Sequence, residues 1–373
     1  MMMIDEILYG ATAPELAARA GKQLSHALAN HRPIALYGAG QTGRWVLSHM
    51  PDLVTYFLDD TPSKQGQVID GIPVLSLDEA ARRFGSDILV IVCIFSAGHH
   101  FPQTKEKLES RFGYEVIHFW NAVLAMASGT PNLFLGPIEN ELAWRDRYFR
   151  LEQKLADDHS RQVLAANLRM RLHADFATNM DSRTDLAFAG SVPENLVYVD
   201  GGAFDGDTIA SFLSWRSSSF ARIVAFEPDS HNFAKLETFL KSLPGDISGR
   251  ISTHRKALWK DDKGIRFSAG GGVASAVTSD GEIFVDTVSL STFSDVTEPM
   301  FIKLDVEGVE QQVLIGDEEF IRKKRPILAI SVYHNQSDLL DIFEMITRWN
   351  LGYNFYLRCH GGDGTDLTLY CIP

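Results

Sequence analysis

The chain has 373 residues, of which 45% are hydrophobic and 22% are charged, a composition typical of a globular protein with a substantial core. At roughly 150 residues per domain, this length predicts two or three domains. Lys and Arg total 35 against 48 Asp and Glu, and the resulting net charge of −13 argues against nucleic acid or an anionic membrane surface as the main partner.

The ends of the chain and its cysteines indicate the compartment. The amino-terminal run MMMIDEILYG contains two acids and no basic residue, so it does not resemble a secretory signal. The longest strongly apolar run, ILVIVCIF at residues 88–95, is too short to cross a bilayer. Three widely spaced cysteines without a C-x-x-C pair predict neither a disulfide framework nor a structural zinc site. We therefore expect a cytoplasmic protein without a membrane span.

The first predicted domain covers residues 1–125. A buried strand at Ile34–Tyr37 runs into the turn GAGQTG at residues 38–43, which opens a helix. Asp59 and Asp60 end the next strand about 20 residues later, as in a nucleotide-binding turn. Strands and helices then alternate to the end of the domain, which predicts a Rossmann-like unit.

The segment FLDDTPSKQGQVIDGIPVLS, at residues 57–76, is similar to the small Rossmann-like domain found ahead of sugar-modifying acyltransferases and in some sugar-biosynthetic enzymes. That resemblance implies that the first domain binds a nucleotide-linked sugar. A scaffold that positions substrate or a partner subunit explains the same sequence, and both interpretations stay open.

A helical connector is expected at residues 126–195, where no strand pattern appears. Between Glu139 and His173 the apolar residues recur at intervals of three and four, which is typical of amphipathic helices. Their apolar faces can pack within the chain or between two copies of it, so a homodimer is one of two expected arrangements.

The third region, residues 196–373, begins with a second strand, glycine turn and helix. Its predicted strands are NLVYVD, RIVAFEPD, ISTHRKAL, FIKLDVEG, PILAISVYH, YNFYLRC and DLTLYCIP, and its predicted helices are TIASFLSW, HNFAKLETFLKSL and VEQQVLIGDEEFIRK. The last two strands leave no room for a helix between them, so we expect an antiparallel pair at one sheet edge. The predicted fold class is α/β, with two Rossmann-like doubly wound domains joined by a helical segment. The second sheet has the layout of a class I methyltransferase fold with an antiparallel edge hairpin.

The turn after the first strand of this region is acidic. It reads DGGAFDGDT from Asp200 to Thr208, and glycines let such a backbone approach a ligand closely. Phe204 and Asp205 stand where a dinucleotide turn has small residues, and Asp205 and Asp207 would repel a pyrophosphate. S-adenosylmethionine, which carries a sulfonium and an ammonium but no phosphate, suits this turn better. A structural turn without a ligand remains the alternative.

Two further acids are expected beside this turn. Glu227 ends the second strand, 27 residues after Asp200, where a carboxylate can accept hydrogen bonds from both ribose hydroxyls. Asp305 ends the fourth strand and is followed by Glu307. The carboxyl ends of parallel strands meet at one edge of a sheet, so we expect these acids to converge on one crevice.

The runs VYVDGGAFDGDT, FEPD, KLDVEGVE, AISVYH and LTLYCIP together resemble the FkbM-type S-adenosylmethionine-dependent methyltransferases, over roughly residues 192–373. Members of such families methylate hydroxyl oxygens of natural products and of sugars in surface glycans, which implies a small-molecule or glycan acceptor. The residues expected to bind the cofactor are Asp200, Gly201, Gly202, Ala203, Phe204, Gly206, Asp207, Thr208, Glu227, Pro228, Ala257 and Asp305. By the same resemblance, Asp305, Glu307 and His334 would face the reacting centre.

Methyl transfer to an alcohol needs in-line positioning and a base that accepts the hydroxyl proton. His334 follows the fifth strand on the ligand side, and an imidazole has a suitable intrinsic pKa. Asp305 is the competing base. The spacing of Asp305, Glu307 and His334 does not demand a metal, so no metal is predicted.

A glycine-rich insertion separates the third and fourth strands at residues 263–290. We expect it to form a hairpin near the site, with Gly270, Gly271, Gly272 and Ser275 in a mobile edge over the substrate.

The leading hypothesis is therefore an S-adenosylmethionine-dependent O-methyltransferase acting on a sugar hydroxyl. An NAD-dependent enzyme of sugar-nucleotide metabolism, using the GAGQTG turn, is the first alternative. A non-enzymatic protein in which both Rossmann-like units serve assembly is the second.

Overall fold

The computed structural model describes residues 4–8, 12–95, 99–126, 138–176, 192–267, 283–361 and 366–373. The chain divides into two compact units, defined as follows. Unit 1 comprises Met1–Glu152, Arg161–Asp181 and Cys359–Thr365, and unit 2 comprises Gln153–Ser160, Ser182–Arg358 and Asp366–Pro373. None of the helices described combines the length and hydropathy that a bilayer crossing requires.

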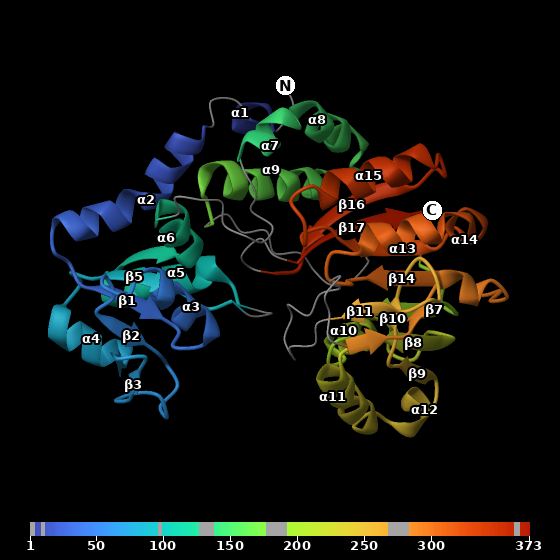
Figure 1. Cartoon of the computed structure of the whole chain (residues 1–373), viewed down its shortest axis with the longest axis horizontal. Coiled ribbons are helices and arrows are strands. Elements are labelled where there is room, and N and C mark those ends of the chain that lie inside the picture. Colours follow the sequence, from blue (N-terminus) through green and yellow to red (C-terminus); the bar gives the residue numbers. More distant parts are fainter. Residues whose placement is uncertain are drawn as a thin grey trace. The chain divides into compact units, whose positions relative to one another are not determined.

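Unit 1 is built on a six-stranded sheet with the order β3-β4-β2-β1-β5-β6, drawn in blue to teal in Figure 1. Its strands are β1 Ile34–Tyr37, β2 Tyr56–Leu58, β3 Val68–Ile69, β4 Ile72–Leu75, β5 Leu89–Val92 and β6 Glu115–His118. The neighbouring pairs run parallel except β3 and β4. Strands β1 and β5 are buried throughout, as expected for central strands covered on both faces.

The helices of the amino-terminal half are α1 Asp5–Leu8, α2 Ala13–Ala29, α3 Gln41–His49, α4 Leu77–Phe84, α5 Phe101–Phe112, α6 Phe119–Met126, α7 Ile138–Ala143, α8 Arg145–Lys154 and α9 Asp158–His173. Helix α2, which the sequence analysis did not identify, lies beside α6 (Figure 1). A Cβ atom on its Gly21 would lie 2.9 Å from Ala125 Cβ, so two small residues allow this close packing. Helices α7, α8 and α9 occupy the segment where amphipathic helices were expected.

Unit 2 is built on a seven-stranded sheet with the order β16-β17-β15-β14-β7-β8-β9. Its strands are β7 Val197–Gly201, β8 Arg222–Phe226, β9 Ile251–His254, β14 Met300–Leu304, β15 Ile327–Ser331, β16 Asn354–Cys359 and β17 Leu367–Ile372. The sheet is parallel from β9 to β15, and β17 runs antiparallel to β15. Strands β7 and β14 are neighbours near the centre of the sheet. From β7 the chain adds β8 and β9 towards one edge, and it then returns to β14 and adds the remaining strands towards the other edge.

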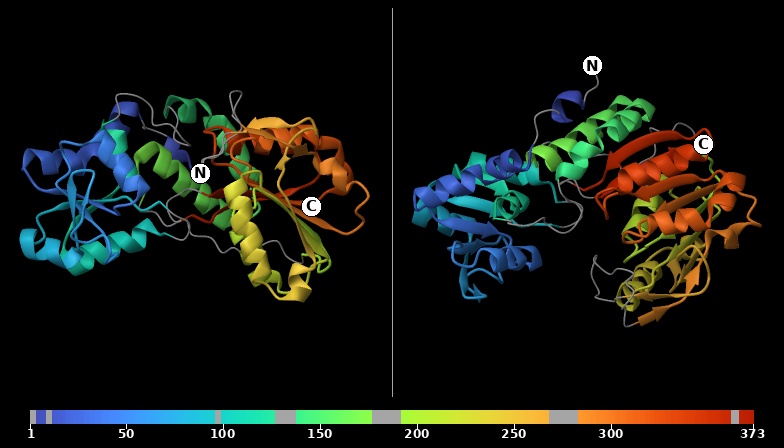
Figure 2. Two further views of the ribbon diagram at one scale, coloured as in Figure 1. Left: turned by 60° about the horizontal axis from the view of Figure 1, so that its bottom comes forward. Right: turned by 45° about the horizontal axis from the view of Figure 1, so that its top comes forward.

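The helices of unit 2 are α10 Asp207–Arg216, α11 Ser230–Lys241, α12 Gly245–Ser248, α13 Glu310–Gly316, α14 Glu318–Lys324 and α15 Asp338–Arg348. In Figures 1 and 2, α11 lies near β8 and β9 at one edge of the sheet and α15 lies beside β16 at the other. Helix α15 was not anticipated from the sequence. Its long buried face, which includes Leu339, Leu340, Ile342, Phe343 and Ile346, explains how it covers that edge.

The single helix expected at residues 309–323 is two helices. The chain breaks at Asp317, whose buried carboxylate accepts hydrogen bonds from the backbone of Leu290 and Ser291 and from the Ser289 hydroxyl. A Cβ atom on the preceding Gly316 would lie 2.3 Å from Lys260 Cα. The break between the two helices therefore lets residues 316 and 317 pack against residues 289–291 and against Lys260.

The strand expected at ISTHRKAL is likewise two strands. Only its first half, β9, joins the main sheet, while β10 Ala257–Leu258 pairs in parallel with β13 Thr287–Val288. The flanks of the glycine-rich insertion, β11 Ile265–Phe267 and β12 Ile283–Val285, form the expected antiparallel pair. The glycines 270–272 and Ser275 lie outside the described residues.

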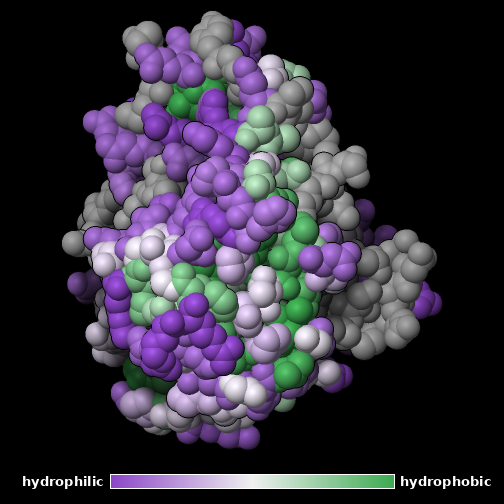
Figure 3. Space-filling view, turned by 90° about the vertical axis from the view of Figure 1, so that its left-hand side faces the viewer, coloured by the Kyte–Doolittle hydropathy of each residue, from purple (hydrophilic) through white to green (hydrophobic). Residues whose placement is uncertain are grey.

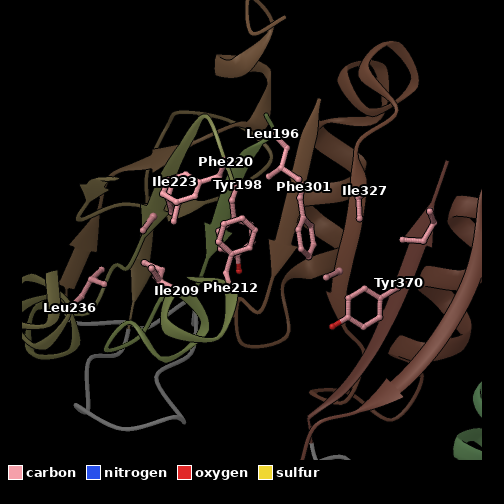
Figure 4. Packing of buried hydrophobic residues seen from close by; sticks show 14 residues of the cluster. Leu196, Tyr198, Ile209, Phe212, Phe220, Ile223, Leu236, Phe301, Ile327 and Tyr370 are labelled. Atoms are coloured by element: carbon pink, nitrogen blue, oxygen red, sulfur yellow. The ribbon is translucent and has the colours of Figure 1, made fainter. Parts of the chain in front are cut away.

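One hydrophobic cluster of unit 2 lies against the sheet between β7, α10 and β14 (Figure 4). Tyr198 of β7 stacks on Phe212 of α10, with ring centroids 4.3 Å apart, and Phe301 of β14 packs beside them. Burying aromatic rings of this size is the largest apolar contribution to the stability of such a unit. This packing fixes the start of α10, and therefore the turn before it, against the central strands.

The exposed surface is mixed. Figure 3, which shows the side of the molecule that lies to the left in Figure 1, has hydrophobic atoms interspersed among hydrophilic side chains. Among the described residues, the large hydrophobic side chains that are well exposed are Leu28, Trp45, Val68, Phe95, Phe284 and Ile315. They belong to different elements, and scattered exposure of this kind is normal for a protein surface.

Candidate active site

The glycine turn after β7 brings the backbone of two strands together. Gly202 has φ +78°, and a Cβ atom there would lie 1.9 Å from the Asp305 carbonyl oxygen. Gly206, with φ +96°, caps α10, and a Cβ atom there would meet the Phe239 ring at 2.4 Å. Only glycine fits both requirements. The sequence of the turn therefore forces the end of β7 against the end of β14.

A partly buried lysine lies between the acids of these two strands. Lys303 Nζ lies 3.5 Å from Asp200 Oδ1 and 3.4 Å from Asp305 Oδ2, and it donates a hydrogen bond to the Gly202 carbonyl at 3.3 Å. Asp200 is fully buried and also accepts a 2.6 Å hydrogen bond from the Thr208 hydroxyl. Burial raises the pKa of Asp200, and Lys303 and Thr208 oppose that rise. The predicted convergence of Asp200 and Asp305 is present, with a cation between them.

Glu227 lies at the tip of β8 and is 6% exposed. One carboxylate oxygen accepts a 2.9 Å hydrogen bond from the backbone N–H of Phe204, and the other accepts one of the same length from Asp229. Asp229, rather than Glu227, caps α11. Burial raises the pKa of Glu227 to about 7 against these two hydrogen bonds. Glu227 is thus attached to the glycine turn without a cationic partner among the described residues.

The other residues expected at the cofactor surround these groups. Gly201 ends β7, and Ala203 is buried in the turn. Asp207 begins α10, Pro228 follows Glu227, and Ala257 lies buried in β10. The neighbour of Ala257, Leu258, occupies the space beside Gly201, where a Cβ atom would lie 2.5 Å from Leu258 Cδ1.

His334 lies after β15 among three carboxylates. Its Nε2 atom is 3.5 Å from Asp305 Oδ1 and 3.6 Å from Glu307 Oε2, while Nδ1 is 3.0 Å from Glu310 Oε1. Glu307 has φ +59°, an uncommon conformation for a residue other than glycine and one often found at functional sites. The structure therefore brings together all three residues expected at the reacting centre.

The charges of this group are strongly coupled. Burial lowers the pKa of His334, but Glu310, Asp305 and Glu307 outweigh it and raise that pKa to about 9. Burial raises the pKa of Glu307 to about 8. For Asp305, burial is opposed by Lys303 and His334, and the net effect is a lowered pKa. The imidazole consequently holds its proton at neutral pH, which differs from the neutral imidazole assumed from its intrinsic pKa.

Four further residues of the site were not assigned a role from the sequence: Lys303, Glu310, Tyr333 and Asp366. Lys303 precedes Asp305 by two positions, so strand periodicity places both side chains on one face and could have identified it. The Tyr333 hydroxyl donates to Asp305 Oδ1 at 3.2 Å. Burial, followed by the charge of Asp305, raises the pKa of Asp366 to about 7. Asp366 is 61 positions from Asp305, so only the fold reveals its proximity.

The glycine turn of unit 1 is also tightly packed, but the acid beside it, Asp59, is paired with a lysine. A Cβ atom on Gly43 would lie 2.0 Å from the Gly38 carbonyl oxygen, so α3 packs tightly on the turn. Asp59 accepts 2.9 Å hydrogen bonds from the backbone N–H of Ala39 and of Thr61, and Lys64 Nζ lies 2.9 Å from it. The acid that would bind a ribose is therefore already paired.

Two surface cavities lie away from both turns. One, of about 540 Å³, lies in unit 1 among Glu6, Arg19, Gln23, Asn121, Arg169 and His173. The other, of about 470 Å³, lies beside Arg222, where β8 begins. Open parallel sheets bind their ligands at the carboxyl ends of strands, so the second cavity is at the wrong edge for a cofactor.

Comparison with known proteins places unit 2 in context. Residues 200–355 match a family model described as the methyltransferase FkbM domain. A solved structure, methyltransferase FkbM from Methylobacillus flagellatus KT, is 23% identical, with a TM-score of 0.73 over 99% of each chain. At this identity the likeness demonstrates a common fold. Among curated proteins, no sequence matches the chain.

More distant solved structures are also methyltransferases. An rRNA methylase from Streptococcus thermophilus is 13% identical and has a TM-score of 0.30, covering 49% of this chain and 89% of its own. Aeropyrum pernix fibrillarin, solved with natively bound S-adenosylmethionine, is 13% identical and has a TM-score of 0.29, covering 49% and 70%. Scores at this level do not establish a shared fold.

Proposed function

We propose that this chain, whose residues 200–355 match the family model of the methyltransferase FkbM domain, transfers the methyl group of S-adenosylmethionine to a hydroxyl oxygen of a sugar, a glycan or a natural product. The observation that carries the proposal is the group of carboxylates at the carboxyl ends of β7, β8 and β14. Asp200, Glu227 and Asp305 lie there around one glycine turn. A sulfonium donor without phosphate suits such an edge, whereas a diphosphate does not.

Glu227 is proposed to bind the ribose. Each of its carboxylate oxygens accepts one backbone N–H, and each retains a further lone pair that can accept a ribose hydroxyl. The backbone of the turn between Gly202 and Gly206 is proposed to bind the methionine part of the cofactor. Pro228 and Ala257 are proposed to line the adenosine side.

The transfer step is a displacement at carbon. As the acceptor oxygen attacks the methyl carbon, a C–O bond forms and the C–S bond breaks, and the positive charge of the sulfonium disappears in the thioether product. The hydroxyl proton passes to a carboxylate of the group formed by Asp305, Glu307 and His334, because the imidazole already holds its proton at neutral pH. Positioning of the two substrates accounts for a large part of the acceleration, and proton removal adds typically 10²–10⁴-fold.

For the amino-terminal unit we propose binding of the nucleotide-linked sugar that carries the acceptor. The glycine turn supports this proposal, because Gly40 has no atom within 4 Å of a Cβ position there and so leaves the start of α3 open to a phosphate. The pairing of Asp59 with Lys64 disfavours the NAD-dependent alternative.

Separate calorimetric titrations with S-adenosylmethionine and with NADH test these proposals. We expect S-adenosylmethionine to bind, NADH not to bind, and Glu227→Gln to weaken the S-adenosylmethionine affinity with the fold intact. Glu318→Gln, which removes an exposed carboxylate paired with Arg322, is the matched control. Binding of NADH with no response to S-adenosylmethionine would reverse the assignment.

A further inference from the structure

We propose that Asp305, Glu310 and His334 bind one divalent cation of the first transition row, beside the methyl-transfer centre. The cation site itself stands on the geometry of these three side chains. Only its catalytic meaning rests on the proposed function.

The three side chains are arranged as ligands of a single ion. Each offers one ligand atom, and the three atoms lie within 4.8 Å of one another. Donors on one ion, at about 2.1 Å each, are separated by up to about 4.2 Å. Closing the group around an ion therefore requires shifts of a few tenths of an ångström, which side-chain rotation can supply.

Unpartnered buried atoms provide an independent indication. Glu310 is 1% exposed, and its Oε2 atom has no hydrogen-bond partner among the described residues, while Oε1 accepts from the Val306 N–H at 2.8 Å. The Nδ1 atom of His334, in a side chain that is 11% exposed, lies 3.0 Å from Glu310 Oε1, but that contact lacks the geometry of a hydrogen bond. Buried polar atoms are rarely left unpaired, because each costs its full desolvation. A cation bound between them would remove that cost.

The donor set selects the class of cation. One imidazole and two carboxylates suit Mn²⁺, Fe²⁺, Co²⁺ or Zn²⁺ better than Mg²⁺ or Ca²⁺, which prefer oxygen ligands only. Asp305 can serve both of its neighbours, because Oδ2 faces Lys303 at 3.4 Å while Oδ1 lies on the His334 side at 3.5 Å.

The position of the cation, beside the proposed methyl-transfer centre, would let it bind the acceptor hydroxyl. A hydroxyl that coordinates a divalent cation loses its proton more readily and is held in a fixed direction. With His334 and Asp305 engaged as ligands, Glu307 is the remaining carboxylate beside the ion. Its side chain is 30% exposed, against 23% for Asp305 and 11% for His334, so it is the member of the group most open to an acceptor.

Titration of the EDTA-treated, dialysed full chain with Mn²⁺, following free Mn²⁺ by electron paramagnetic resonance, tests the site. A parallel titration with Zn²⁺ uses a chromophoric chelator as competitor. We expect one ion per chain, and at least a tenfold loss of affinity in Glu310→Gln and in His334→Gln. Glu318→Gln should bind as the unmodified protein does. If one variant does not fold, as judged by circular dichroism, the other carries the test.

The site is refuted if neither ion binds at one equivalent, or if the folded variants bind both ions unchanged. S-adenosylmethionine binding in the presence of EDTA is measured separately. Its absence would overturn the proposed function and leave the cation site to be judged by the two titrations alone.

Discussion

The two units of this protein share a central strand, a glycine turn and a buried acid that binds the turn, but the acid has different partners in each unit. In each, a central strand runs into a glycine turn where a Cβ atom would lie about 2 Å from a carbonyl oxygen, at Gly43 in unit 1 and at Gly202 in unit 2. In each, a buried acid from the neighbouring strand holds a backbone N–H of the turn, Asp59 that of Ala39 and Glu227 that of Phe204.

The two units differ in the other partners of this buried acid. Asp59 lies 2.9 Å from the ammonium of Lys64, and although burial opposes it, this partner and the Thr61 backbone lower its pKa. Among the described residues, the donors to Glu227 are backbone N–H groups, and burial raises its pKa to about 7. Of these two acids, we infer that Asp59, paired with a lysine and with two backbone N–H groups, has a structural role. Glu227, which has no cationic partner among the described residues, is available to a ligand. The partners of the acid, and not its position in the sequence motif, therefore distinguish the two turns.

The largest effect is expected from alanine at the two tight glycines. Gly202→Ala would place a methyl group 1.9 Å from the Asp305 carbonyl in a left-handed backbone, and Gly43→Ala would place one 2.0 Å from that of Gly38. We expect each to destabilise its own unit by about 4 kcal/mol or more. Peptide-resolved hydrogen exchange should show faster exchange in the mutated unit. Only Gly202→Ala should abolish S-adenosylmethionine binding; loss in both variants would contradict a cofactor site confined to unit 2.

Glu227→Gln should weaken S-adenosylmethionine binding by about 100-fold. A hydrogen bond to a charged group contributes about 1.5–3 kcal/mol, and each 1.4 kcal/mol is a factor of ten in affinity. Isothermal titration calorimetry measures the change. An affinity within threefold of the unmodified protein would mean that Glu227, like Asp59, is only structural.

Asp59→Asn should lower the stability of unit 1 by about 2 kcal/mol, because it breaks the partly buried pair with Lys64 and replaces an acceptor facing two N–H donors. Urea unfolding, with hydrogen exchange to assign the change to unit 1, gives the value. S-adenosylmethionine affinity should stay the same. If the unmodified protein bound NADH and this variant did not, Asp59 would be a ribose ligand after all.

The smallest effect is a difference in the pH dependence of the two units. The pKa of Glu227 rises on folding from 4.5 to about 7, so its contribution to the stability of unit 2 is present below pH 4.5 and is lost as pH rises towards 7. The pKa of Asp59 falls on folding from 3.8, so its contribution to unit 1 is present above pH 3.8 and is lost in stronger acid. Hydrogen exchange between pH 4 and 7, corrected for the intrinsic rate, should show Glu227→Gln flattening the slope of unit 2. An unchanged slope would contradict the raised pKa.

Much of the candidate site could be predicted from the sequence. The strand tips that carry Asp200, Glu227 and Asp305 follow from buried apolar runs of four or five residues and from the rule that parallel strands end at one edge. His334 was placed on that edge for the same reason. The cofactor and the roles of these residues remain proposals, and the partners of each acid could not be predicted, because they come from other parts of the chain.

The sequence by itself determined the α/β class, the glycine turns and the end of the sheet at which the acids gather, because these depend on local periodicity and on backbone freedom at single residues. Only the tertiary structure decided that Asp59 pairs with a lysine while Glu227 has no cationic partner among the described residues. It also decided that Glu310 contacts Nδ1 of His334, and that Asp366, just before the last strand, lies near Asp305. Burial and charge pairing depend on residues that are distant in the chain, so no local pattern encodes them.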